Sequence, residues 1–356
     1  MEVWKKRVRR VCVGVLLLAL VLRVSGSSPQ TSPASVPVGS DSLTSFLLYL
    51  QTGRAVKPTE PETTPGSETV PASAPPAEEP TEEATVPEAT TVFSFPTAPA
   101  DPGPMRFSAG DKELLEVKYG GDYRPDLGAL LEQPVDLNFS GEEPRVLILH
   151  THATEAYTME SGWEYTPSGD YRTLDTGYNM VRVGDEITQV LEEAGIPVLH
   201  DETLNDYPSY NGSYNKALTR IEQYLAEYPS IQMVIDVHRD AVEYEDGGQM
   251  ATAATVGGQR SAQVMLVMGT DEGGLNHPGW QDNLAFALKL QVQLERDYPG
   301  LARPLSLRTE RFNQHATPGS MLVEVGTAGN TLSEALTAAH CFAETLAELI
   351  AGLGLR

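Results

Sequence analysis

The sequence contains few cysteines and few basic residues, and both shortages exclude whole classes of protein. Its only cysteines are Cys12 and Cys341, so neither a disulfide-stapled fold nor a cysteine-ligated zinc site is expected. The chain has 25 Lys and Arg against 49 Asp and Glu, a net charge of −24 over 356 residues. An acidic chain does not accumulate on DNA or RNA by counterion release, so nucleic-acid binding is a poor hypothesis.

One apolar run, close to the N-terminus, has the pattern of an export signal. Five Lys or Arg lie within residues 5–10, and an almost unbroken apolar run follows at residues 11–22. We interpret residues 1–24 as a signal anchor or a cleaved signal peptide, with the anchor favoured. The basic flank predicts a single-pass cell-membrane protein that contacts the membrane through residues 11–24 and has an extracytoplasmic catalytic domain.

Residues 25–105 have the composition of a disordered spacer. They contain 15 of the 26 prolines, and the remainder is dominated by Thr, Ser, Ala and Glu. Such a segment cannot bury enough apolar surface to offset its chain entropy, and proline and acidic repulsion keep it extended. We therefore expect a tether that holds a folded head, residues 106–356, away from a membrane.

In the head, predicted strands alternate with predicted helices. Apolar runs predict strands at residues 145–149, 196–199, 231–237, 262–268, 305–311 and 321–325. Apolar residues at helical spacing predict helices at residues 178–193, 214–228, 284–298 and 332–353. This alternation predicts a single α/β domain with a mostly parallel central sheet flanked by helices on both faces.

Polar side chains gather where three of these strands end. The first strand runs into His152 and Glu155, and the third runs into His238. Glu324 interrupts a later apolar strand, and all these positions would lie near one edge of a parallel sheet, where ligands bind. Two His and one Glu are a common zinc set in hydrolases, so we predict that His152, Glu155 and His238 bind zinc. A buried carboxylate without a role is costly, so Glu324 is the predicted general base and acid.

Both assignments have alternatives. His150 would share a strand face with His152 if that strand continued, and it would then compete as the metal ligand. Asp240 is the next candidate for the general base. The remaining histidines are expected to be structural: His200, His277, His315 and His340.

Three segments resemble the signatures of the stage II sporulation protein P family. They read HTHATEAY from His150, DVHRD from Asp236 and LVEVG from Leu322, in the family's order. The resemblance implies a membrane-anchored, zinc-dependent N-acetylmuramoyl-L-alanine amidase with an amidase-like catalytic domain. It implies peptidoglycan hydrolysis, with endopeptidase cutting as a further activity, during engulfment in sporulation. The partners it implies are a SpoIID-like lytic transglycosylase and a SpoIIM-like membrane protein.

The chain departs from the wider amidase pattern at one ligand. Those amidases take their glutamate from about a dozen residues after the first histidine. This chain has Glu164 there, with Asp170 and Asp175 beyond it. These three residues are therefore rivals of Glu155.

Two other functions stay open at this point. A zinc carboxypeptidase or deacylase uses a similar ligand set, and Arg239 is expected to bind substrate, for example by holding a terminal carboxylate. The second alternative is a non-enzymatic wall-binding scaffold on an amidase fold. The presence of all four candidate residues favours an enzyme.

Overall fold

The structure is a computed structural model that describes residue 95, residues 104–245 and residues 247–356. The predicted signal segment and nearly all of the predicted spacer lie outside this part, so both stay predictions. Within the described part, no helix combines the length and the apolar character that crossing a membrane requires.

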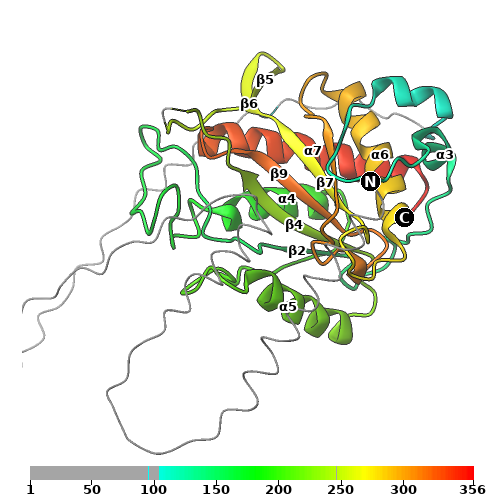
Figure 1. Ribbon diagram of the computed structural model, residues 1–356, viewed down its shortest axis with the longest axis horizontal. Helices are drawn as coiled ribbons and strands as arrows, with labels where there is room; N and C mark the ends of the chain where they lie inside the picture. The colour runs from blue at the N-terminus through cyan, green and yellow to red at the C-terminus, as the bar shows by residue number, and fades with distance from the viewer. Residues whose placement is uncertain (1–94, 96–103, 246) are drawn as a thin grey trace, which may run out of the picture. The chain divides into compact units, whose positions relative to one another are not determined.

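A seven-stranded sheet forms the centre of the head, in the order β1-β8-β7-β9-β4-β2-β3 (Figure 1). Its strands are Val117–Tyr119 (β1), Val146–Leu149 (β2), Val198–His200 (β3), Met233–Asp240 (β4), Val264–Gly269 (β7), Leu305–Arg308 (β8) and Met321–Thr327 (β9). Neighbouring strands are parallel everywhere except between β7 and β9. The mostly parallel sheet is therefore confirmed, and β2, β4 and β9 run in the same direction.

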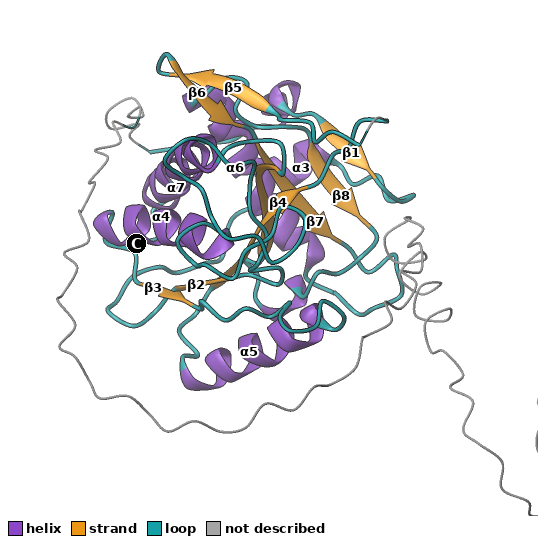
Figure 2. Cartoon of the chain, turned by 90° about the vertical axis from the view of Figure 1, so that its left-hand side faces the viewer, coloured by secondary structure: helices purple, strands orange, loops and turns teal. Residues whose placement is uncertain are grey.

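Helices cover both faces of the sheet, as predicted, but unequally (Figure 2). One face carries α3 (Leu127–Glu132), α4 (Met180–Glu193), α6 (Trp280–Asp297) and α7 (Leu332–Gly352), which pack into the main core. The opposite face carries α5 (Ser213–Glu227). Short 3-10 helices lie at Ala109–Leu114 and Gln314–Ala316.

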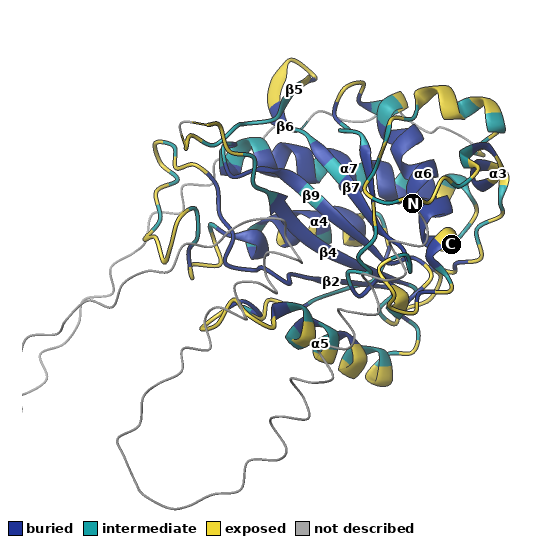
Figure 3. Ribbon diagram, viewed as in Figure 1, coloured by how far each residue is buried: buried dark blue, intermediate teal, exposed yellow. Residues whose placement is uncertain are grey.

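Strand β2 explains why both faces need cover. Its four residues are all apolar and buried, as the dark strands of Figure 3 illustrate. Successive side chains of a strand point to opposite faces. Val146 and Ile148 accordingly join the main core, whereas Leu147 and Leu149 pack in a second cluster with residues of α5 such as Ile221.

Every predicted strand and helix is present, with ends that differ by a few residues. Four further elements were not predicted: β1, α3 and the hairpin of β5 (Ala253–Val256) and β6 (Gln259–Ala262), because elements this short carry little periodicity. The reversal of direction between β7 and β9 was not predicted either, since apolar runs do not encode the direction of pairing.

Candidate active site

The predicted site residues meet at the shared carboxyl edge of β2, β4 and β9. His238 of β4 lies directly beside Glu324 of β9 in the sheet register, so both side chains point to the same face. Their sequence neighbours Val237 and Val323 belong to the main core on the other face. His238 and Glu324 therefore face the side that carries α5.

Asp236 lies beside the imidazole of His238. One carboxylate oxygen, Oδ1, lies 2.9 Å from Nε2 of His238. The same carboxylate accepts hydrogen bonds from the backbone N–H of Thr151 at 2.8 Å and from its hydroxyl at 2.6 Å. The other imidazole nitrogen, Nδ1, lies 3.8 Å from Oε2 of Glu155. Although burial opposes it, Asp236 with Glu155 and Glu324 raises the pKa of His238 to about 9.

His152 follows β2 in a turn and packs among aromatic rings. Its imidazole stacks on Tyr210 with ring centroids 4.4 Å apart, and it meets the ring of His238 edge-on at 5.4 Å. Burial lowers the pKa of His152 to about 4, which favours the neutral, lone-pair form. Its Nδ1 is buried and has no hydrogen-bond partner among the described residues.

Glu155 is buried close to both histidines and to two arginines. Its Oε1 lies 3.4 Å from Nη2 of Arg172 and 3.9 Å from Nη1 of Arg239. Burial by itself would raise the pKa of Glu155, but Arg239, the two histidines and Arg172 together lower it. Glu155 is therefore held as a carboxylate.

A buried network fixes the loop that carries Glu155. The guanidinium of Arg172 donates through Nη1 to Oδ2 of Asp206 at 2.6 Å and to the hydroxyl of Thr154 at 2.9 Å. Asp206 also accepts from the backbone N–H and the hydroxyl of Thr154. Sequence reasoning missed this network, because its members lie far apart in the chain and match no short motif. Asp236 had a visible signal, since it lies two residues before His238 and so on the same strand face.

Glu324 has the opposite environment from Glu155. Its Oε2 is buried and has no hydrogen-bond partner in the described part of the chain. Burial raises the pKa of Glu324 to about 8; Asp240 and Glu155 add to the shift, while His238 and Arg239 oppose it. A carboxyl group with a pKa near 8 exchanges its proton readily around neutral pH.

The rival acidic residues lie outside this cluster. Glu164, Asp170 and Asp175 are all exposed. Glu164 accepts a hydrogen bond from the backbone N–H of Gly162, and Asp175 accepts one from Gly177. The structure thus brings Glu155, and not these three, beside His238.

The other two alternatives are engaged elsewhere. Strand β2 ends at Leu149, so the condition under which His150 would share a face with His152 is not met. Both ring nitrogens of His150 have partners, the carbonyl oxygen of Val237 and Nε2 of His200. Asp240 pairs with Arg303, whose Nη2 lies 2.9 Å from its Oδ2.

Arg239 is buried and contacts the backbone of the loop that follows β2. Its Nε donates to the carbonyl oxygen of Ala156 at 2.9 Å, and its Nη2 donates to that of Tyr171 at 3.0 Å. Through these hydrogen bonds Arg239 holds the loop around Glu155 in place. The expected contact with substrate stays a prediction.

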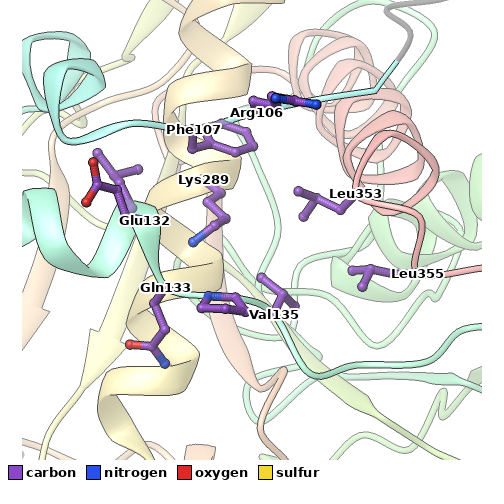
Figure 4. Close-up of a pocket in the computed structure, with 10 residues that line it drawn as sticks. Arg106, Phe107, Glu132, Gln133, Val135, Lys289, Leu353 and Leu355 are labelled. Carbon is purple, nitrogen blue, oxygen red and sulfur yellow. The ribbon is translucent and has the colours of Figure 1, made fainter.

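The structure also has a pocket of about 390 Å³, whose lining residues Figure 4 shows. Its lining includes Phe107, Lys289 and Leu353. The ammonium of Lys289 donates to the carbonyl oxygen of Leu130 at 3.0 Å, and burial lowers its pKa to about 8. None of the predicted site residues lines this pocket, so we do not assign the predicted chemistry to it.

The donor set at the sheet edge fits zinc in kind. His152 has an unpartnered buried nitrogen, and Nε2 of His238 lies 2.9 Å from a carboxylate oxygen of Asp236, a kind of neighbour that is usual for metal-binding histidines. The ligand atoms of His152, Glu155 and His238 do not all lie within 4.8 Å of one another. Within the described residues, one group meets that distance: Asp185, His200 and Glu202. Zinc binding at the sheet edge would thus draw its three ligands closer together.

The fold and the site define an α/β protein with two buried histidines, the buried Glu155 and the half-buried Glu324 at one sheet edge, a set typical of metal-dependent hydrolases. A sequence model of the stage II sporulation protein P family matches residues 63–347. The chain belongs to this family.

A relative from Bacillus subtilis is similar to part of the chain. Stage II sporulation protein P of Bacillus subtilis (strain 168) is 29% identical over 221 residues, which are 59% of this chain and 52% of that protein. The chain thus spans about half the length of this relative.

Solved structures of amidases are similar at lower identity. N-acetylmuramyl-L-alanine amidase Ami1 from Mycobacterium smegmatis is 16% identical, with 61% of this chain and all of that chain covered and a TM-score of 0.34. The CwlD amidase from Clostridioides difficile, solved in complex with the GerS lipoprotein, is 15% identical, with 58% and 98% covered and a TM-score of 0.35.

Proposed function

We propose that the head is a zinc-dependent N-acetylmuramoyl-L-alanine amidase, which hydrolyses the bond between muramic acid and the stem peptide of peptidoglycan during sporulation. His152, Glu155 and His238 would bind the metal. The observation that carries the proposal is the pair of glutamates beside His238: Glu155 lies 3.8 Å from its Nδ1 and has a lowered pKa, whereas Glu324 is its neighbour in the sheet register and has a pKa near 8. Enzymes assign different roles to two carboxyl groups in this way.

Each of these residues has a definite task in such a reaction. Bound zinc would act as a Lewis acid that activates water and polarises the scissile carbonyl. Glu324 accepts the proton of the attacking water at its unpartnered Oε2 and returns it to the nitrogen of the leaving amine. Asp236 keeps the imidazole of His238 in one orientation, and Arg239 with Arg172 keeps Glu155 ionised.

The surroundings of the site support a polymeric sugar–peptide substrate. Tyr210, which stacks on His152, is 46% exposed, so an aromatic surface borders the site. Amphipathic aromatic rings combine apolar contact with hydrogen bonding, which suits sugar rings. The carboxypeptidase alternative has less support, because the guanidinium of Arg239 is engaged with backbone carbonyls.

We further propose the setting that the sequence predicts. Residues 11–24 would anchor the chain in the cell membrane, and residues 25–105 would place the head at the wall. A SpoIID-like transglycosylase and a SpoIIM-like membrane protein are the proposed partners, and engulfment is the proposed process. Endopeptidase cutting is proposed as a second activity.

Digestion of purified peptidoglycan tests the function. The full-length chain should release stem peptides with a free L-alanine amine, and mass analysis should detect muramic acid without peptide. A chelator should abolish this release, and added zinc should restore it. Glu324→Gln, which keeps the side-chain shape, is the matched inactive control. Release of single terminal amino acids would favour the carboxypeptidase, and intact peptidoglycan would favour the scaffold.

A further inference from the structure

A second cluster of metal-ligating side chains lies on the opposite face of the sheet. We call Asp185, His200 and Glu202 the outer triad. Asp185 belongs to α4, His200 is the last residue of β3, and Glu202 follows it by two residues. The ligand atoms of the triad all lie within 4.8 Å of one another. The side chain of His200 is 8% exposed and that of Asp185 is 48% exposed, so the cluster is anchored inside and opens to solvent.

The hydrogen bonds of His150 and His200 determine which of their ring nitrogens carry hydrogen. His150 faces the carbonyl oxygen of Val237 with Nδ1, and a carbonyl accepts only, so this nitrogen carries hydrogen. In neutral His150 the other nitrogen, Nε2, then has a lone pair. It lies 2.8 Å from Nε2 of His200, which must therefore donate to it.

The same reasoning continues to the carboxylate. If Nε2 of neutral His200 carries the hydrogen, Nδ1 has a lone pair. This Nδ1 lies 3.1 Å from Oδ1 of Asp185, which also offers only lone pairs when ionised. With Glu202 alongside, lone pairs of one imidazole and two carboxylates converge. Only a positive species between them, either a proton or a metal ion, makes the arrangement favourable.

Helix α4 packs against this histidine pair and leaves space for it at Gly184. Gly184 lies inside α4, and a Cβ atom there would come within 2.5 Å of Nε2 of His200 and 2.7 Å of Nε2 of His150. Glycine weakens a helix interior relative to alanine. The absence of a side chain at this position is thus what allows the two imidazoles to meet.

We propose that the outer triad binds a divalent transition-metal ion such as Zn²⁺, with Asp185, His200 and Glu202 as ligands. One imidazole and two carboxylates are a donor set that such ions accept, at distances of about 2.0–2.2 Å. The exposed side of the cluster leaves the remaining coordination position to water. His150 accepts the hydrogen of the ligating imidazole and fixes its tautomer, as partners of metal-binding histidines do.

This ion would be linked to the active site through the backbone. His150 lies two residues before His152, and its Nδ1 bonds the carbonyl of Val237, the residue before His238. Because side chains alternate along strands, the two sites lie on opposite faces yet share these strand ends. Binding at the outer triad would therefore stiffen the segments that position both active-site histidines.

Metal content of the full-length chain tests the proposal. After saturation with Zn²⁺ and removal of loosely bound metal, we expect two zinc ions per chain. Asp185→Asn/Glu202→Gln should hold one, and because both positions are exposed the variant should still fold. Glu192→Gln/Glu193→Gln removes two exposed charges from the same helix and should still hold two.

His238→Ala separates this proposal from the proposed function. It should also hold one zinc ion, and adding Zn²⁺ should shift the ¹⁵N signal of Nδ1 in His200. If Asp185→Asn/Glu202→Gln holds as much zinc as its control, a proton alone occupies the outer triad and the proposal is wrong. If His238→Ala holds as much zinc as the wild type while Asp185→Asn/Glu202→Gln holds one ion less, zinc binding at the outer triad is supported and the proposed zinc ion at the active site is contradicted.

Discussion

The loop after β2 and strand β9 each place one glutamate close to His238, yet the surroundings of the two side chains differ. The loop places Glu155 near Arg172 and Arg239, which keep it ionised. The strand removes Glu324 from water with one carboxylate oxygen unpartnered, so its pKa rises to about 8. The difference shows that the same side chain is held as an anion or favours its protonated form according to its surroundings.

The largest effect should follow from removing the proton carrier. Glu324→Gln keeps the shape of the side chain but cannot accept a proton, so turnover of peptidoglycan fragments should fall by about 10² to 10⁴. Steady-state rates on soluble fragments measure this loss. Glu192→Gln, at an exposed position of α4, is the control and should keep full activity. Full activity of Glu324→Gln would mean that the general base is elsewhere.

A second substitution tests how much the ion pair between Arg172 and Asp206 stabilises the loop after β2. Arg172→Gln removes the partner of Asp206, whose side chain is fully buried, and leaves an uncompensated charge. Arg172 itself is partly exposed, so we expect a loss of about 2–3 kcal/mol in the free energy of unfolding. Urea denaturation measures it. Arg182→Gln removes an arginine of similar exposure from an i,i+4 pair on α4 and should cost less. If both variants lose the same free energy of unfolding, the loop network stabilises the protein no more than an ordinary ion pair on a helix.

A third prediction uses the pH dependence of stability. Folded Glu324 keeps its proton up to a pKa of about 8, whereas an unfolded glutamate releases it near 4.5. Between these values the folded state holds more protons, so raising the pH favours unfolding of the wild type relative to Glu324→Gln. In metal-free protein, the difference in free energy of unfolding should grow by about 1–3 kcal/mol from pH 5.5 to pH 8.5. A difference that does not change with pH would contradict the assigned environment of Glu324.

The sequence was enough to predict which residues come together, but not which glutamate is ionised. Strand ends and apolar runs were enough to bring His152, His238 and Glu324 to one edge, because parallel strands align their carboxyl ends. The arginines around Glu155 come from loops whose folding no periodicity encodes. Their positions determine which glutamate is ionised, so the division of roles became visible only in three dimensions.

The surroundings of His200 could not be predicted from the sequence at all. A lone histidine at the end of a short strand gave no reason to expect anything but a structural role. Its pairing with His150 depends on α4 crossing at Gly184, a contact between distant parts of the chain. Only the packing of the helix against the sheet places Asp185 beside that imidazole.

The metal content of Glu155→Gln and Glu324→Gln, measured side by side in the full-length chain, tests the central claim most directly. Glu155 is the proposed ligand, so Glu155→Gln should lose the zinc ion that depends on His238. Glu324 is the proposed proton carrier, so Glu324→Gln should be folded, fully loaded with zinc and nearly inactive. The reverse result, with zinc lost from Glu324→Gln and kept by Glu155→Gln, would contradict the assignment of the two glutamates.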